Sequence, residues 1–311
     1  MKLITTKELF DWANSHNKAI CAFNVNNMEL IQAVTEAADE MGLPIILQVS
    51  KGARSYAQPV YLRKLVEAAC ECIKIPVALH LDHGDSFELC KASIDGGFTS
   101  IMIDGSALTY EENIKLTKSV VDYAKGYAAK HGREVVSVEG ELGELAGIEE
   151  HVSSEKSHYT DPAVVKDFVK RTGVGSLAVS IGTSHGAFKY KPGSKPELRL
   201  DILAEIGKQI PKTPLVLHGA SSVTPADVNT INQYGGKILS AMGMEESELA
   251  KTIPLGVRKI NIDSDLRLAF TAKVREYFAQ NPAQFDPRGY LGAARAHVKE
   301  IVKKKLEIFT K

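Results

Sequence analysis

The sequence lacks several features that would place the protein in a specialised class. Its 311 residues include only four cysteines and one tryptophan. The cysteines, Cys21, Cys70, Cys72 and Cys90, form no CxxC pair and no zinc-finger spacing. They therefore indicate neither a disulfide-stabilised scaffold nor a structural metal ribbon. We expect idle thiols in a reducing cytoplasm.

Net charge and long apolar runs are also missing. The 38 basic residues balance the 38 acidic ones, which argues against a broad electrostatic footprint on nucleic acid or an anionic membrane. No run approaches the roughly 18–20 apolar residues that a membrane span needs. The N-terminal segment lacks the apolar core of a secretory signal, so we expect a cytoplasmic protein. A hydrophobic content of 44% excludes a disordered or fibrous chain.

What the chain does contain is a regular alternation of short apolar segments and longer amphipathic ones. The strands are expected at 19–25, 44–50, 77–83, 100–105, 135–142, 177–183, 215–220 and 257–263. Their Val, Ile and Leu content is typical of parallel strands buried on both faces. Helical patterns lie between them at 28–41, 59–74, 110–131 and 161–172, with a final charged helix within 283–311. The sequence Thr5-x-x-Glu8 fits the capping box of an entry helix.

Eightfold strand–helix alternation predicts an α/β fold, a (β/α)8 TIM barrel formed by residues 1–311 as a single catalytic domain. An open doubly wound sheet is the alternative, but no GxGxxG follows the first strand. The long segments 143–160 and 221–256 follow strands, so we expect them at the C-terminal face of the barrel, where active sites form.

Histidines gather at the predicted strand ends. A lone histidine is more often a hydrogen-bonded structural residue, but His83, His185 and His218 each follow a different strand beside glycine or a carboxylate. Three imidazoles with an open position are the ligand set of catalytic Zn2+. We therefore expect these three side chains to hold zinc.

Carboxylates on the intervening strands extend this site. Asp104 and Glu141 are hard oxygen ligands that could bind the same ion or a second cation, either divalent or monovalent. Glu139 lies on the same face of its strand as Glu141. We favour Glu141 because it is nearer the rim.

Asp82 immediately precedes His83. A carboxylate beside a metal-bound substrate is placed to move a proton, so we expect Asp82 to be the catalytic base. The alternative is that it only orients an imidazole. His80, on the same strand, is assigned no role.

Groups suited to phosphate follow the sixth, seventh and eighth strands. Glycines, hydroxyls and one lysine occur in HGAFK (185–189), GAS (219–221) and at Ser264. Phosphate sites of TIM barrels commonly lie after the last two strands.

Seven segments give the chain a resemblance to a known family. They are AFNVNNMEL (22–30), LHLDHGDSFE (79–88), SIMIDGSAL (100–108), VEGELGELAG (138–147), SIGTSHGAFK (180–189), LHGASSV (217–223) and VRKINIDSDLRLAF (257–270). The chain resembles the class II, zinc-dependent fructose-bisphosphate aldolases and the related tagatose-bisphosphate aldolases. The resemblance extends from the first strand to the eighth.

The resemblance implies reversible aldol cleavage of fructose 1,6-bisphosphate to dihydroxyacetone phosphate and glyceraldehyde 3-phosphate, as in glycolysis. It implies Zn2+ on His83, His185 and His218, further metal ligands at Asp104 and Glu141, and proton transfer by Asp82. The implied contacts of dihydroxyacetone phosphate are Gly186, Lys189, Gly219, Ser221, Asn261, Asp263 and Ser264. Asn24 and Ser50 match positions near the aldehyde half, and Glu149 and Glu150 lie on a segment that resembles the family's mobile catalytic loop.

Alternatives remain at this point. A Schiff base on Lys259 is disfavoured because this lysine lies mid-strand, away from the rim. A metal-dependent hydrolase and a non-catalytic sugar-phosphate binder are weaker readings. Asp263, Asp265 and Arg267 resemble the fructose enzymes more than the tagatose enzymes. The family also implies a homo-oligomer, a dimer or a tetramer.

Overall fold

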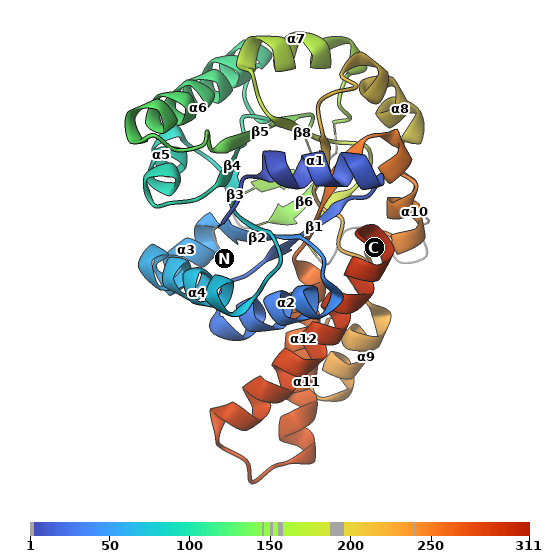
Figure 1. The fold of residues 1–311 in the computed structure, drawn as a ribbon. Helices are drawn as coiled ribbons and strands as arrows, with labels where there is room; N and C mark the ends of the chain where they lie inside the picture. The colour runs from blue at the N-terminus through green and yellow to red at the C-terminus, as the bar shows by residue number, and fades with distance from the viewer. Residues whose placement is uncertain (1–2, 145, 150–151, 155–157, 187–195, 239–240) are drawn as a thin grey trace.

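The computed structural model describes residues 3–144, 146–149, 152–154, 158–186, 196–238 and 241–311. Within them, eight parallel strands close into a barrel in chain order (Figure 1). They are β1 (Ile20–Asn24), β2 (Ile45–Ser50), β3 (Val77–Gly84), β4 (Ser100–Ile103), β5 (Ser137–Leu142), β8 (Ser176–Val179), β10 (Leu215–Leu217) and β11 (Val257–Ile262). The predicted TIM barrel is confirmed, and the open sheet is wrong because β1 pairs with β11 and closes the ring.

Helices surround the barrel, and the sequence sets many of their ends. The described helices are α1 (Thr6–His16), α2 (Met28–Met41), α3 (Lys51–Ala57), α4 (Pro59–Cys72), α5 (Phe87–Asp95), α6 (Tyr110–His131), α7 (Pro162–Thr172), α8 (Leu200–Gln209), α9 (Pro225–Gln233), α10 (Glu246–Ala250), the 3-10 turn η1 (Ile253–Leu255), α11 (Ser264–Gln280) and α12 (Pro287–Phe309). Thr5 and Glu8 form the predicted capping box. Gly42 and Gly132 end α2 and α6 in left-handed conformations, as glycine allows. None of the helices described here has the length and apolarity to cross a membrane.

The barrel is sealed at the end where its strands begin. Helix α1 lies across this end (Figure 1) and buries Leu9, Phe10 and Ala13 against the interior residues Ile20 and Ile46. Burying an apolar side chain stabilises the fold by about 1.5–3 kcal/mol. This floor closes one end, so the polar residues of the barrel interior lie between it and the C-terminal rim.

Helices α11 and α12 run side by side and extend beyond the barrel (Figure 1). The predicted final helix within 283–311 corresponds to α12. The inner part of α12 packs on α2, where Lys299 and Lys303 pair with Glu40. Phe285, in the connection between α11 and α12, is 89% exposed.

A small second sheet lies at the C-terminal face and includes part of the long polar segment 143–160. β6 (Ala146–Glu149) pairs antiparallel with β7 (Val152–Ser154) and parallel with β9 (Ser184–His185). The sequence did not predict this sheet, because 143–160 has no alternation of apolar and polar residues. It links the segment after β5 to the segment after β8.

Candidate metal centre and active site

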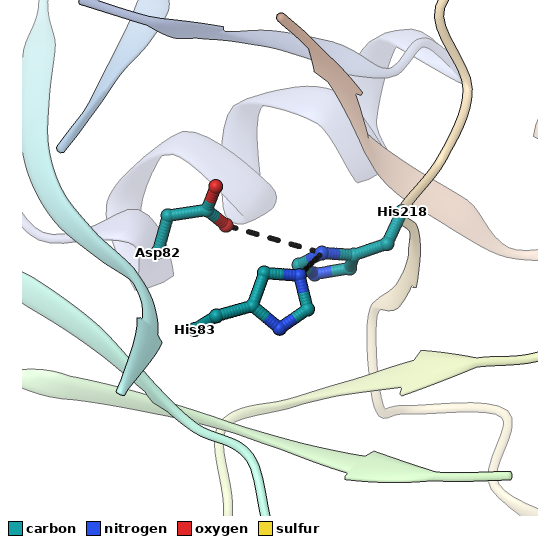
Figure 2. Close-up of side chains that lie close together, drawn as sticks. All are labelled: Asp82, His83 and His218. Atoms are coloured by element: carbon teal, nitrogen blue, oxygen red, sulfur yellow. Dashed lines mark hydrogen bonds and ion pairs between the residues drawn. The ribbon is translucent and has the colours of Figure 1, made fainter. Parts of the chain in front are cut away.

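A β-bulge brings two consecutive residues of β3 to the centre of the rim. Successive side chains of a strand normally point to opposite faces, so Asp82 and His83 should diverge. The pairing of β3 with β4 shifts register between Leu81 and Gly84, and His83 has a φ of 45°. Bulges next to active sites re-aim side chains in this way. Asp82 and His83 consequently lie together with His218, which follows β10 (Figure 2).

The two imidazoles are oriented by carboxylates on their far sides. Nδ1 of His83 lies 3.1 Å from Oδ2 of Asp104, and Nε2 of His218 lies 2.8 Å from Oε1 of Glu139. A carboxylate only accepts hydrogen bonds, so these two ring nitrogens carry the protons. Nε2 of His83 and Nδ1 of His218 then carry lone pairs, as in metal-ligating histidines, and Nδ2 of Asn261 lies 3.0 Å from Nδ1 of His218.

These two remaining nitrogens face each other across 2.9 Å. The rings meet edge to face, with centroids 4.5 Å apart and planes at 71°. Two lone pairs at this distance repel unless a proton or a cation lies with them. Because Asp82 stands beside both rings, with Oδ1 3.9 Å from Nδ1 of His218, the surroundings favour positive charge. The donor set therefore fits a divalent cation.

Glu141 contributes an oxygen that has no hydrogen-bond partner among the described residues. Its Oε2 is buried without a hydrogen bond and lies 3.9 Å from Nδ1 of His83. Burial and the charge of Asp104 raise the pKa of Glu141 well above its ordinary value. A buried carboxylate oxygen without a donor is costly, and a metal ion would satisfy it. His83, Asp104 and Glu141 form a second group able to hold a cation.

Asp104 itself is already engaged at both oxygens. Oδ1 accepts hydrogen bonds from the amide and hydroxyl of Ser106 at 2.9 and 2.7 Å, while Oδ2 faces His83. Its position agrees with orienting the imidazole as well as with ligating a cation. The sequence did not separate the two glutamates, and they lie in different places. Glu141 lies with His83 and Asp104, whereas Glu139 contacts Nε2 of His218.

Asp82 is held in place by asparagines. Nδ2 of Asn24 donates to Oδ2 of Asp82 at 2.7 Å, and Nδ2 of Asn261 lies 3.4 Å from Oδ1. Burial raises the pKa of Asp82, but the charges of His83 and His218 outweigh it and keep the pKa below its ordinary value. Asp82 is therefore a carboxylate that can accept a proton from a group beside the imidazoles.

A series of buried polar contacts extends from Glu139 through the barrel interior. Nζ of Lys259 lies 2.9 Å from Oε2 of Glu139 and 3.1 Å from Nε2 of His80. Nδ1 of His80 lies 2.7 Å from the hydroxyl of Ser100. Lys259 is fully buried. Its ammonium pairs with Glu139 instead of reaching the rim, so Lys259 is not available for the Schiff-base alternative.

This chain of contacts was not predicted. The sequence predicts no part in the site for His80 or Lys259. The one sequence signal was period-two alternation, which puts Lys259 on the same face of β11 as Asn261, and His80 on the same face of β3 as Asp82. Alternation alone does not show that Glu139 joins them, because that pairing spans different strands.

Residues predicted to bind substrate surround a small cavity at the ends of β1, β10 and β11. Its lining is Asn24, Gly186, Gly219, Ala220, Ser221, Asn261, Asp263 and Ser264. Oγ of Ser221 accepts hydrogen bonds from the amides of Asp263 and Ser264, both at 3.2 Å. Helix α11 begins at Ser264, and the amides and partial positive charge of a helix N-terminus favour an anion.

The backbone at Gly219 requires glycine. Its φ is 61°, and a Cβ added there would lie 2.5 Å from the carbonyl oxygen of Ser184. Other residues rarely adopt this conformation. The loop after β10 therefore packs directly on the backbone of β9.

Of the remaining predicted residues, Ser50 lies beside Asp82 and the side chains of the others lie outside the described residues. Ser50 pairs in register with Asp82 and caps α3, with Oγ accepting from the amide of Ala53 at 3.2 Å. The main chain of His185 is in β9, but its side chain lies outside the described residues, as do Lys189, the side chain of Glu149, and Glu150.

Comparisons with known proteins agree with this arrangement. The family model described as "Fructose-bisphosphate aldolase class-II" matches residues 4–311. The fructose-bisphosphate aldolase of Treponema pallidum is 49% identical over 96% of this chain and 93% of that protein. That of Thermus caldophilus is 47% identical over 99% of this chain and 98% of that protein.

A solved structure of an aldolase is also similar to this chain. The YdjI aldolase of Escherichia coli K12 superposes on this structure with a TM-score of 0.74 and is 29% identical in sequence. The match covers 99% of this chain and 98% of that chain. The resemblance of motifs from β1 to β11 is thus matched by sequence identity and by fold. The chain belongs to the class-II fructose-bisphosphate aldolase family.

Proposed function

We propose that this protein catalyses the reversible cleavage of fructose 1,6-bisphosphate to dihydroxyacetone phosphate and glyceraldehyde 3-phosphate. The observation that carries the proposal is the meeting of Asp82, His83 and His218 at the rim of the barrel (Figure 2). The names of the relatives at 41–49% identity support the substrate.

We propose Zn2+ as the metal, held by His83 and His218 together with His185, and with Glu141 and Asp104 beside it. Nitrogen ligands of this kind favour zinc over magnesium or calcium. When bound, the cation acts as a Lewis acid toward the substrate carbonyl, where negative charge develops during cleavage. Glu141 and Asp104 could hold a second divalent or a monovalent cation.

Asp82 is the proposed proton-transfer residue. Breaking the bond between C3 and C4 requires the C4 hydroxyl to lose its proton, and a carboxylate beside the imidazoles can take it. In condensation the same group returns the proton to the aldehyde oxygen. The hydrogen bond from Asn24 fixes the carboxylate so that one oxygen faces the metal site. Nε2 of Gln48 donates to Oδ1 of Asn24 at 2.9 Å and fixes that asparagine in turn.

The phosphate of the dihydroxyacetone half is proposed to bind at the N-terminus of α11. Ser221, Ser264 and the backbone of Gly219 surround that position, together with Gly186, Asn261 and Asp263. Lys189 would add a cation. Binding energy gained at a remote phosphate can be used to position the reacting bond. Asn24 and Ser50 are the proposed neighbours of the aldehyde half.

The assembly is proposed to be a homodimer or homotetramer. Two exposed phenylalanines on the protruding hairpin, Phe278 in α11 and Phe285 between α11 and α12, support an interface there, because exposed apolar surface gains stability when it is covered. Light scattering on the purified protein measures the mass. The cytoplasmic location and the single catalytic domain remain predictions of the sequence.

A coupled assay tests the function. Purified enzyme is given fructose or tagatose 1,6-bisphosphate, before and after treatment with a chelator, and again after Zn2+ is added back. We expect faster cleavage of the fructose substrate, loss of cleavage on chelation and recovery with Zn2+. Cleavage that survives complete metal removal would contradict the metal mechanism. A preference for tagatose bisphosphate would replace the proposed substrate.

Asp82→Asn, a near-isosteric change that removes the base, tests the catalytic role of Asp82. It should lower kcat by about 100-fold or more, within the range measured for general bases. Asp122→Asn, an exposed carboxylate on α6, should leave kcat unchanged. Full turnover of the Asp82 variant would show that another group is the base.

A further inference from the structure

Lys305 is a buried cation on α12 that the proposed mechanism does not use. Its side chain is 2% exposed, and Nζ lies 2.6 Å from Oε1 of Glu246 and 2.7 Å from Oδ2 of Asp265. It also donates to the hydroxyl of Ser222. Burial lowers the pKa of Lys305, but the charges of Asp265 and Glu246 outweigh burial and keep the pKa above its ordinary value. Lys305 is therefore charged at neutral pH.

Asp265 connects this cation to the loop that follows β10. Its Oδ2 accepts a hydrogen bond from the amide of Ser222 at 3.0 Å, and its Oδ1 accepts one from the amide of Val223 at 2.6 Å. Two successive backbone amides are thus bound by one carboxylate. Because Lys305 pairs with the same carboxylate, the cation fixes its orientation.

The loop needs this support because its backbone is strained. Val223 has a φ of 52° and is 1% exposed. Positive φ in a β-branched residue is a genuine outlier. Such conformations persist only where the surrounding structure over-determines them, and they cluster at ligand sites. The hydrogen bond from Val223 to Asp265 is the polar contact that holds this residue.

The strained residue lies two positions from the proposed phosphate site. Ser221 binds the amides at the start of α11, and Gly219 packs on β9. From another side, a Cβ added at Gly243 would lie 2.5 Å from the carbonyl oxygen of Ser222, so that segment packs backbone against backbone on the loop. A change at 222–223 is therefore transmitted along the chain to Ser221.

We infer that Lys305 is a positioning residue for the phosphate-binding loop. Through Asp265 and Ser222 it holds residues 219–223 in the conformation that presents Gly219 and Ser221 to the phosphate of the substrate. The inference rests on the proposed function, and it gives Asp265 a role in supporting the loop rather than in contacting sugar. Lys305 acts from behind the loop, since the contacts described for its ammonium are to protein groups.

The test compares the full-length wild type with Lys305→Met, which keeps the length of the side chain and removes its charge. The KM for fructose 1,6-bisphosphate and the dissociation constant for inorganic phosphate should each rise about tenfold, as expected from losing hydrogen bonds to a charged group. The kcat should change by less than about threefold, because the reacting groups are untouched. Lys304→Met, the exposed neighbour on the same helix, is the matched control and should match the wild type.

A double-mutant cycle shows whether Lys305 acts through Asp265. Asp265→Asn should also raise the phosphate dissociation constant, since its amide can no longer accept from both Ser222 and Val223. Adding Lys305→Met to that variant should then change phosphate binding by less than the product of the two single effects. Independent, multiplicative effects would overturn the inference.

A folded Lys305→Met enzyme with wild-type KM and phosphate affinity would also overturn it, even if its melting temperature falls. If Lys305→Met does not fold, Ser222→Ala removes one link and should give a smaller rise in the same two constants; wild-type values would count against the role. A wild type that binds phosphate but fails to cleave fructose 1,6-bisphosphate would refute the proposed function. The phosphate comparison would still decide the role of Lys305.

Discussion

Nε2 of His218 and Oε1 of Glu139 lie 2.8 Å apart, and both side chains are 1% exposed. Since the carboxylate can only accept, this contact fixes the tautomer of His218 and leaves Nδ1 for a metal. Lys259 binds the other oxygen of Glu139. The interior of the barrel therefore sets the chemistry of a residue at its rim.

Replacing Glu139 with glutamine should weaken metal binding. The amide can accept from His218 or from Lys259 through its one oxygen, and its NH2 group faces the other donor. We expect the affinity for Zn2+ to fall by about 10–100-fold, measured by competition with a chromophoric chelator. Glu134→Gln, on the exposed segment before β5, is the control. Equal affinities of the Glu139 variant and the wild type would show that this contact does not support the metal.

Lys259 should form no covalent adduct with substrate. Its ammonium is fully buried and paired with Glu139, so it is unable to attack a ketone at the rim. Borohydride added together with dihydroxyacetone phosphate should leave the intact mass of the protein unchanged. A mass increase located at Lys259 would establish the Schiff-base route instead.

Much of the fold could be predicted because local sequence decides it. The eight Val-, Ile- and Leu-rich segments coincide with the barrel strands, and the predicted helices 28–41 and 110–131 coincide with α2 and α6, which end at Gly42 and Gly132. The short helix α3 has no such pattern in KGARSYA. The sheet of β6, β7 and β9 depends on pairing between distant segments, which local preference does not encode.

The sequence predicted which residues gather at the rim better than how their side chains are arranged. Histidines and carboxylates at strand ends indicated a metal centre, and Asp82, His83 and His218 do lie together. The bulge that lets Asp82 and His83 point to the same place has no sequence signature, because alternation predicts the opposite. The contact of Glu139 with His218 joins residues 79 positions apart and follows only from closure of the barrel.

Gly219→Ala should damage the phosphate site, because its φ is 61° and a Cβ would meet the backbone of Ser184. Strain of this kind costs on the order of 1–3 kcal/mol, so the free energy of unfolding should fall and the KM should rise. Gly126→Ala is the matched control: it lies exposed in α6 with no atom near the added Cβ. It should stabilise the protein by about 0.5–1 kcal/mol without changing the KM. Equal effects of Gly219→Ala and Gly126→Ala on stability and KM would contradict the placement of Gly219 at the phosphate site.

The ion pairs of Glu40, which join α2 to α12, should make the stability of the protein depend on pH. Hydrogen bonds from Lys299 and Lys303 lower the pKa of Glu40 from 4.5 to about 2. Because the folded pKa is depressed, this contribution is present above the ordinary pKa and is lost as pH falls toward 2. The wild type should melt at a higher temperature than Glu40→Gln at pH 7, and the difference should vanish near pH 2. A difference that persists unchanged at pH 2 would exclude ionisation of Glu40 as its source.

The facing nitrogens of His83 and His218 are the proposed ligands of the catalytic metal. Anomalous diffraction at the zinc edge from crystals of the zinc-loaded protein locates the ion. We expect a peak bonded to Nε2 of His83 and Nδ1 of His218, with Glu139 still hydrogen-bonded to Nε2 of His218. A zinc peak elsewhere, with the two imidazoles still facing each other at 2.9 Å, would contradict it.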